Sequence, residues 1–179
     1  MAIKPTTRNS TSRWPSRTVL KGIRLFATDV DGVLTDAGMY YSESGDEWKK
    51  FNTRDGMGLK LLQRAGLVTA IVTQERTRLV ARRAEKLAIP ELHQGVMDKL
   101  SVIRDMAERH GISLRQIAYI GDDVNDMEAL NAVGFSAAPA DGLPQVRKIV
   151  DYVCRLKGGE GAVRELAEMI LEAQQHRLR

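Results

Sequence analysis

Asp29 and Asp31 stand two residues apart at the end of residues 24–28, a short apolar run that is typical of a buried strand. Gly32 follows the pair and permits a sharp turn. Two carboxylates this close can hold a metal ion or share acid, base and nucleophilic work. Asp-Gly pairs also form ordinary turns and helix caps, so the pair by itself fits a structural role equally well.

A second group of acids, Asp122, Asp123 and Asp126, repeats this arrangement after the apolar run 117–120. Aspartates here also suit a helix N-terminus, where they accept from exposed amides. If both runs are parallel strands of one sheet, however, the two groups share an edge, and like charges at that density need a cation. Hard oxygen ligands suit Mg²⁺. The spacing therefore predicts a magnesium site.

Two further residues could act on an anion bound beside this metal. Thr73 follows the apolar run 67–72, so its hydroxyl would point into the same crevice, although it could also cap the next helix. Lys99 lies near the start of a predicted helix, where the helix dipole mildly disfavours a cation. An exposed surface position remains the ordinary alternative for such a lysine.

The elements that must position these residues alternate between strands and helices. Strands are predicted at 24–28, 67–72, 117–120, 134–138 and 152–154, a β-hairpin at 39–51, and helices from 58 and at 76–88, 98–110, 126–133, 143–150 and 161–175. This order predicts an α/β fold with a Rossmann-like, doubly wound parallel sheet and a hairpin insertion. Such sheets bind ligands at the carboxyl ends of their strands, where the acids stand.

The composition fits one globular domain of 179 residues with 43% hydrophobic and 28% charged residues. A single cysteine excludes an intrachain disulfide framework, and no apolar run approaches the length of a membrane span, about 20 residues. We therefore expect a cytoplasmic protein with no membrane partner. Residues 1–20 are predicted to be a disordered basic leader, and residues 21–179 a single domain.

The net charge of +4 would ordinarily suggest a nucleic-acid partner. Residues 1–24, however, hold six of the 27 basic residues and none of the 23 acidic ones. Without them 21 basic residues face 23 acidic ones, so the remainder is slightly acidic. This distribution predicts no nucleic-acid partner.

These motifs resemble the haloacid dehalogenase-like phosphatase superfamily. The first motif, 29–35 (Asp-Val-Asp-Gly-Val-Leu-Thr), is the most specific, and Thr73, Lys99 and Gly121-Asp-Asp-Val-Asn-Asp126 follow in the superfamily's order. The resemblance spans residues 20–175. It implies a phosphatase that requires Mg²⁺.

The resemblance also assigns roles. Asp29 would be the nucleophile and form an aspartyl-phosphate, while Asp31 would act as general acid and then general base. Thr73 and Lys99 would grip the phosphoryl oxygens. The metal would be held by Asp29, Asp122 and the backbone carbonyl of Asp31, with Asp123 near its shell and Asp126 orienting Lys99.

Only 37 residues separate Thr35 from Thr73, which leaves no room for a cap domain. This is similar to the capless branch, typified by 3-deoxy-manno-octulosonate 8-phosphate phosphatases. There a homotetramer closes the active site, and its hairpins, here 39–51, form a shared barrel. The resemblance therefore implies a homotetramer that acts on a phosphorylated sugar acid.

The choice of sugar acid depends on the residues after Thr73. The octulosonate enzymes usually carry Thr-Gly-Arg, whereas this chain has Thr-Gln-Glu, with Glu75 in place of the arginine. Together with Lys86, Glu75 resembles the 2-keto-3-deoxy-nononate 9-phosphate phosphatases, so we favour a nine-carbon acid over the octulosonate. We expect both on one helix face, about 16 Å apart along its axis, although a solvated pair is the plain alternative. Arg54 and Arg164 are candidates to bind the substrate carboxylate, or else form surface salt bridges.

Two other classes share some of these features. A phospho-receiver signalling domain also uses strand-end aspartates, Mg²⁺, Thr and Lys, but its acidic pair follows the first strand and its phosphorylated Asp the third. Here the order of the motifs fits the phosphatase. A non-catalytic homologue is disfavoured because Asp29, Asp31, Thr73, Lys99 and Asp122 are all present.

Overall fold

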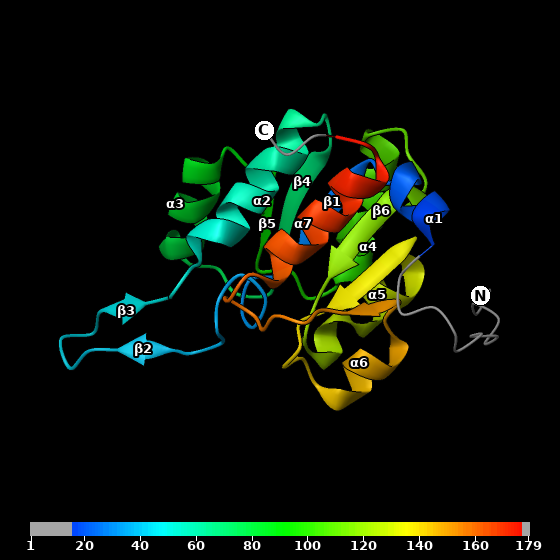
Figure 1. The fold of residues 1–179 in the computed structure, drawn as a ribbon. Coiled ribbons are helices and arrows are strands. Elements are labelled where there is room, and N and C mark those ends of the chain that lie inside the picture. Colours follow the sequence, from blue (N-terminus) through cyan, green and yellow to red (C-terminus); the bar gives the residue numbers. More distant parts are fainter. Residues whose placement is uncertain (1–15, 177–179) are drawn as a thin grey trace.

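A six-stranded parallel sheet forms the centre of the fold in the computed structural model, which describes residues 16–176 (Figure 1). The strand order is β5-β4-β1-β6-β7-β8, and every neighbouring pair is parallel. The strands are β1 (Leu25–Thr28), β4 (Val68–Thr73), β5 (Glu91–Gln94), β6 (Ile117–Ile120), β7 (Phe135–Ala138) and β8 (Tyr152–Val153). The predicted α/β class and doubly wound sheet are confirmed.

Helices cover both faces of the sheet, which is why β1 and β6 are buried along their whole length. One core cluster joins the sheet to α1 (Arg17–Gly22), α2 (Thr53–Arg64), α3 (Arg78–Leu87) and α7 (Ala162–Ala173). The other joins it to α4 (Lys99–Arg109), α5 (Met127–Ala132) and α6 (Pro144–Ile149). Two 3₁₀ turns, η1 (Leu114–Gln116) and η2 (Val124–Asp126), flank β6.

The chain leaves β1 toward β4 and β5 on one side and then returns to place β6 on the other. The direction of winding therefore reverses between β1 and β6, and the carboxyl ends of these two strands flank the resulting crevice. This is where an open parallel sheet binds its ligand. Both groups of acids follow these two strands.

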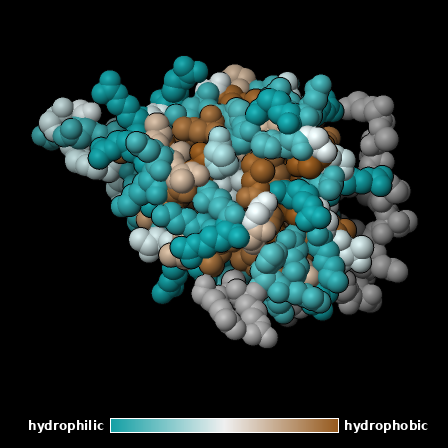
Figure 2. Space-filling model, turned by 90° about the horizontal axis from the view of Figure 1, so that it is seen from above, coloured by the Kyte–Doolittle hydropathy of each residue, from teal (hydrophilic) through white to brown (hydrophobic). Residues whose placement is uncertain are grey.

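The predicted hairpin is present as β2 (Tyr40–Tyr41) and β3 (Glu47–Trp48), which pair antiparallel. It projects from the body at the left of Figure 1, and no cap domain separates β1 from β4. Tyr41 and Trp48 are 68% and 52% exposed, unusually high for large aromatic side chains. Seen from above, the body's surface is mainly hydrophilic with hydrophobic residues between (Figure 2).

Three elements differ from the sequence-based expectation. Strand β5 was not predicted, because Glu91-Leu-His-Gln is polar and forms an edge strand without an apolar run. Helix α2 begins at Thr53 rather than at 58, since the Asn52 side chain accepts from the Arg54 amide at 2.8 Å and caps it. Helix α3 begins only at Arg78, capped by Thr77, so placing Glu75 on one helix face with Lys86 was wrong.

The described chain begins inside the segment expected to be the leader. Helix α1 starts at Arg17, and Leu20 is buried in the core. Residues 1–15 of the predicted leader lie outside the described residues. From 16 to 176, every helix is too short or too polar to cross a membrane.

Candidate active site

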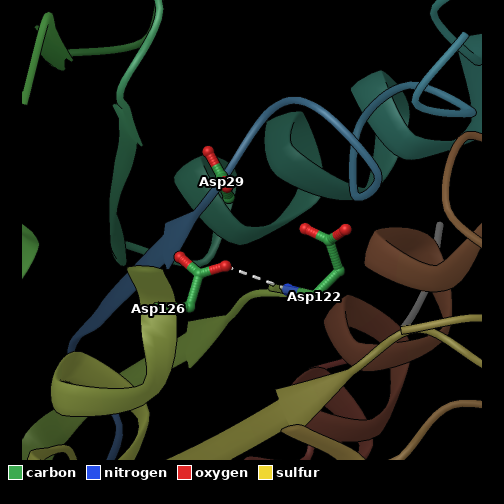
Figure 3. A group of neighbouring side chains, drawn as sticks. All are labelled: Asp29, Asp122 and Asp126. Carbon is green, nitrogen blue, oxygen red and sulfur yellow. Dashed lines mark hydrogen bonds between the residues drawn. The ribbon is translucent and has the colours of Figure 1, made fainter. Parts of the chain in front are cut away.

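Three carboxylates converge where β1 and β6 end (Figure 3). Asp29 directly follows β1, whereas Asp122 and Asp126 belong to the loop and 3₁₀ turn after β6. One oxygen from each lies within 4.8 Å of the other two. The sequence-based expectation that the two acidic strand ends meet is confirmed.

Asp126 is completely buried, and both of its oxygens are engaged. Oδ2 accepts from the backbone amides of Asp122 and Asp123 at 3.0 and 3.2 Å. Oδ1 accepts from Lys99 Nζ at 2.6 Å and from the Tyr119 hydroxyl at 2.5 Å. A carboxylate held by four donors is suited to orient its neighbours rather than to bind a metal; the family resemblance implies this orienting role for Asp126, and the role stays a prediction.

Lys99 connects the two acidic strand ends. It stands in the first turn of α4, whose N-terminus Asp98 caps by accepting from the Ser101 amide. Its ammonium is buried and donates to Asp29 Oδ2 at 2.7 Å as well as to Asp126. Burial lowers the pKa of Lys99, but the charges of Asp29 and Asp126 outweigh this and raise it overall. Lys99 is therefore a fixed cation beside Asp29.

One lysine does not neutralise this cluster. Burial, and then the charge of Asp126, raise the pKa of Asp29 to about 7 despite the contact with Lys99. Burial and the charges of Asp29 and Asp126 raise the pKa of Asp122 to about 8. The Asp122 Oδ1 atom is buried without a hydrogen-bond partner. Buried oxygens with uncompensated charge are the donor set that a hard divalent cation requires, so the residues present fit Mg²⁺.

A cleft of about 480 Å³ opens over these carboxylates. It is lined by the predicted site residues Asp29, Asp31, Thr73, Glu75, Asp122 and Asp123, together with Ala37, Gln74 and Asn125. Thr73 ends β4 and is 2% exposed. The cleft joins the ends of β1, β4 and β6.

Two glycines allow the backbone to form this cleft. Gly32 adopts a φ of +77°, which turns the chain directly after Asp31. A Cβ on Gly121 would lie 2.4 Å from the carboxyl carbon of Asp126. Larger residues at either position would displace a carboxylate.

Residues 70–166 match the haloacid dehalogenase-like hydrolase family. The chain is 41% identical, over 86% of its length and 82% of the relative's, to the 3-deoxy-D-manno-octulosonate 8-phosphate phosphatase KdsC of Escherichia coli K12. It is 43% identical to the enzyme of the same description from Yersinia pestis, over 85% and 81% of the two chains.

The chain belongs to the haloacid dehalogenase-like hydrolase family. The predicted superfamily and the predicted enzyme class, phosphoric monoester hydrolase, are both confirmed by these relatives. The 3-deoxy-D-manno-octulosonate 8-phosphate phosphatase of Moraxella catarrhalis, solved with magnesium, phosphate and a KDO molecule, superimposes with a TM-score of 0.87 at 42% identity. The alignment covers 89% of this chain and 91% of that one.

The hydrolase site also contains two residues that sequence reasoning missed. Tyr119 is 1% exposed and donates to Asp126; a hydroxyl within the apolar run Ile-Ala-Tyr-Ile signals such a buried partner. Lys49 leaves the hairpin and donates to Asp31 Oδ1 at 2.6 Å and to Glu75 Oε2 at 2.5 Å. Nothing in the sequence distinguishes Lys49 from its neighbour Lys50.

Three residues predicted to bind the sugar lie elsewhere on this hydrolase. Lys86 is exposed in the last turn of α3, and Arg54 is exposed in the first turn of α2. Arg164 donates to Glu168 at 2.7 Å, the surface pair that the plain alternative describes. None of the three lines the cleft of the described chain, and their predicted roles stay predictions. Of the four substrate-binding residues proposed from the sequence, Glu75 lines the cleft.

Proposed function

We propose that this chain is a Mg²⁺-dependent phosphatase that hydrolyses the phosphate monoester of a 2-keto-3-deoxy sugar acid. The observation that carries the proposal is the cluster of buried Asp29, half-buried Asp122 and buried Asp126, whose charge Lys99 does not neutralise. The relatives support 3-deoxy-D-manno-octulosonate 8-phosphate as the first substrate to test, because that compound is in their names.

Asp29 is the proposed nucleophile. One of its oxygens accepts from the Val30 amide at 2.7 Å and the other from Lys99, so the carboxylate is held in one orientation toward the cleft. Asp29 would attack phosphorus and form an aspartyl-phosphate, while the sugar alkoxide leaves. Lys99 would neutralise charge on the phosphoryl oxygens, and the Thr73 hydroxyl would donate to one of them.

Asp31 is the proposed general acid and base. It would protonate the departing sugar oxygen and, in the second step, remove a proton from the water that hydrolyses the aspartyl-phosphate. Mg²⁺ would be held by Asp29, Asp122 and the backbone carbonyl of Asp31, near Asp123, and would supply charge neutralisation for the transferred phosphoryl group. Asp126, fixed by Tyr119, would keep Lys99 aimed at Asp29.

A nine-carbon acid is the second candidate substrate, supported by Glu75. The Glu75 carboxylate lines the cleft and lies two residues after Thr73 in the chain. At this position the octulosonate enzymes usually carry arginine. A carboxylate accepts from sugar hydroxyls, whereas arginine seeks anionic groups. Glu75 is the proposed determinant of sugar choice, assisted by Lys86 of a neighbouring subunit.

A homotetramer completes this proposal. The hairpin exposes Tyr40, Tyr41 and Trp48, and a two-stranded hairpin is marginally stable without packing partners. We propose that four hairpins pack together and that each cleft is closed by a neighbour, which excludes water from the phosphoryl group. Light scattering coupled to size exclusion should report about four chains per particle; a fully active monomer would refute this assembly.

The test of the substrate is the ratio of kcat/KM on octulosonate 8-phosphate and nononate 9-phosphate. Losing one charge-assisted contact costs about 1.5–3 kcal/mol, or roughly 10- to 150-fold in kcat/KM. Glu75→Ala should impose a loss of this size on the nononate ester and much less on a generic aryl phosphate. Equal small losses on all esters would remove the nononate proposal. If the wild-type protein hydrolyses neither sugar phosphate faster than a generic phosphate ester, the proposed substrate class is rejected.

A further inference from the structure

Lys49 is the residue through which the hairpin contacts two carboxylates that line the cleft. It directly follows β3, yet it contacts residues 18 and 26 positions away in the chain, Asp31 and Glu75. Its side chain is 0% exposed, whereas that of the adjacent Lys50 is 58% exposed. Burying a lysine side chain is costly unless its charge is paired. The burial of Lys49 therefore depends on these two carboxylates.

The two carboxylates in turn depend on Lys49. Both oxygens contact the same ammonium, at 2.6 and 2.5 Å, so they stand no more than about 5 Å apart. Without a cation between them, Asp31 and Glu75 would repel each other and turn apart. Lys49 thus fixes the distance between the loop that follows β1 and the loop that follows β4.

The contact also selects one oxygen of Asp31. Lys49 donates to Oδ1, and the Thr35 hydroxyl approaches the same atom at 3.5 Å. The carboxylate lines the cleft, so Oδ2 is the oxygen that remains to exchange a proton with a leaving group. A proton-transfer group works only when it lies within hydrogen-bond reach of the reacting atom.

We propose that Lys49 is a positioning residue that holds the Asp31 carboxylate in place for proton transfer, with Glu75 as its anchor. This inference rests on the proposed role of Asp31 and deepens it. It assigns Glu75 a second effect besides sugar contact, because a change at Glu75 reaches Asp31 through Lys49. The hairpin is thereby connected to chemistry within its own chain.

Leaving-group dependence tests the proposal. The nitrophenolate group of an aryl phosphate leaves without being protonated, whereas the alkoxide of an alkyl phosphate needs the proton from Asp31 to leave. Lys49→Met keeps an unbranched side chain that is one atom shorter and removes the ammonium. We expect its kcat/KM on alkyl phosphates to fall about 10- to 100-fold, part of the roughly 10²- to 10⁴-fold that general acid–base catalysis contributes, and its kcat/KM on the aryl phosphate to fall less than about 3-fold. This ratio is the one compared because it reports the steps up to the aspartyl-phosphate and excludes its hydrolysis, which uses Asp31 with either ester.

Two comparisons separate positioning from a merely structural role. Lys50→Met is the matched control, since Lys50 pairs with Asp36 outside the cleft, and both esters should be hydrolysed at wild-type rates. In the double variant with Asp31→Asn, the alkyl-ester losses should not add, because Lys49 acts through Asp31. If Lys49→Met does not fold, Glu75→Gln provides the test, with a smaller loss of the same leaving-group pattern.

Equal losses on alkyl and aryl esters, unchanged rates on both, or additive effects in the double variant would overturn the proposal. These outcomes are measured on generic alkyl and aryl esters, and the ratio of the two rates in each variant is compared with the ratio in wild type. They are therefore distinct from a failure of the sugar-acid assignment. That failure would appear as wild-type protein that hydrolyses neither sugar phosphate faster than a generic ester.

Discussion

Two polar clusters, one around a single buried acid and one with three acids, stand at opposite ends of the same sheet, and their chemistry differs. At the amino end, Glu91 opens β5 and accepts from Arg109 through both oxygens, at 2.7 and 3.0 Å, and contacts His93 and His110. These hydrogen bonds, led by those from Arg109, lower the pKa of Glu91 to about 2. At the carboxyl end, burial raises the pKa of Asp29 to about 7.

The difference lies in how the buried charge of each cluster is compensated. Glu91 has basic partners on β5 and α4 and needs nothing further. Lys99 pairs with Asp29 and Asp126, and one buried oxygen of Asp122 has no hydrogen-bond partner. A protein tolerates such an uncompensated cluster where function requires it. We therefore expect substitutions in the two clusters to have opposite effects on activity and stability.

Asp29→Asn should produce the largest effect. Removing the proposed nucleophile should lower turnover by more than about 10³-fold. The melting temperature of the metal-free protein at about pH 8 should stay equal or rise, because one of three like charges is removed. Phosphate-release assays and thermal unfolding measure the two quantities, and wild-type-like turnover would contradict the assignment of the nucleophile.

Glu91→Gln should show the reverse pattern. Loss of a charged acceptor that serves Arg109 should cost about 1–3 kcal/mol of unfolding free energy, while kcat changes less than about 3-fold. The folded pKa of Glu91 lies below its ordinary value, so its contribution is present above about pH 4.5 and is lost as pH falls toward 2. Denaturant unfolding of wild type and Glu91→Gln at several pH values checks this. A difference in unfolding free energy that persists undiminished at pH 2 would show that the charge of Glu91 is not its cause.

The pH dependence of metal binding sharpens the comparison. Because the pKa values of Asp29 and Asp122 are raised to about 7 and 8, the folded metal-free protein binds more protons than the unfolded chain between about pH 4 and pH 8. Its stability from these groups therefore decreases as pH rises through that window. Mg²⁺ competes with the protons, so excess Mg²⁺ should raise the melting temperature more at about pH 8 than at about pH 5.5.

Asp122→Asn is the control for this measurement. It removes the carboxylate whose Oδ1 is unpartnered, so it should abolish most of the difference between the two pH values. Equal shifts with Mg²⁺ at both pH values in the wild-type protein would show that the raised pKa values do not govern metal binding.

Asp105→Ala should have the smallest effect. Asp105 accepts from Arg109 at 2.9 Å across one helical turn, but its side chain is 61% exposed. Exposed pairs of this kind contribute about 0.3–0.5 kcal/mol. A loss of unfolding free energy as large as that of Glu91→Gln would show that the stabilisation comes from fixing Arg109 and not from pairing the buried Glu91.

The sequence predicted the carboxyl end of the sheet better than the amino end. Apolar runs followed by aspartates identify β1 and β6, because strands covered on both faces must be apolar throughout. The residues around Glu91 carry no such pattern, since an edge strand with polar partners resembles a loop. The acids of the candidate site were predicted because they directly follow these apolar runs in the sequence.

Contacts made across long separations escaped prediction. Lys49 reaches Glu75 over 26 residues, and only the folded hairpin brings them together. Glu75 itself was placed on a helix because the residues after it are strong helix formers, yet the Thr77 side chain caps α3 and starts it at Arg78. Capping and tertiary pairing are decided by geometry that spacing alone does not contain.

The initial rate of phosphate release from octulosonate 8-phosphate, measured with and without Mg²⁺, tests the account most directly. Wild type and Glu91→Gln should turn over only with Mg²⁺ and at similar rates, whereas Asp29→Asn should show no turnover in either condition. Turnover without Mg²⁺ in wild type, or turnover by Asp29→Asn, would contradict the claim that the uncompensated acids at the carboxyl end are the catalytic centre.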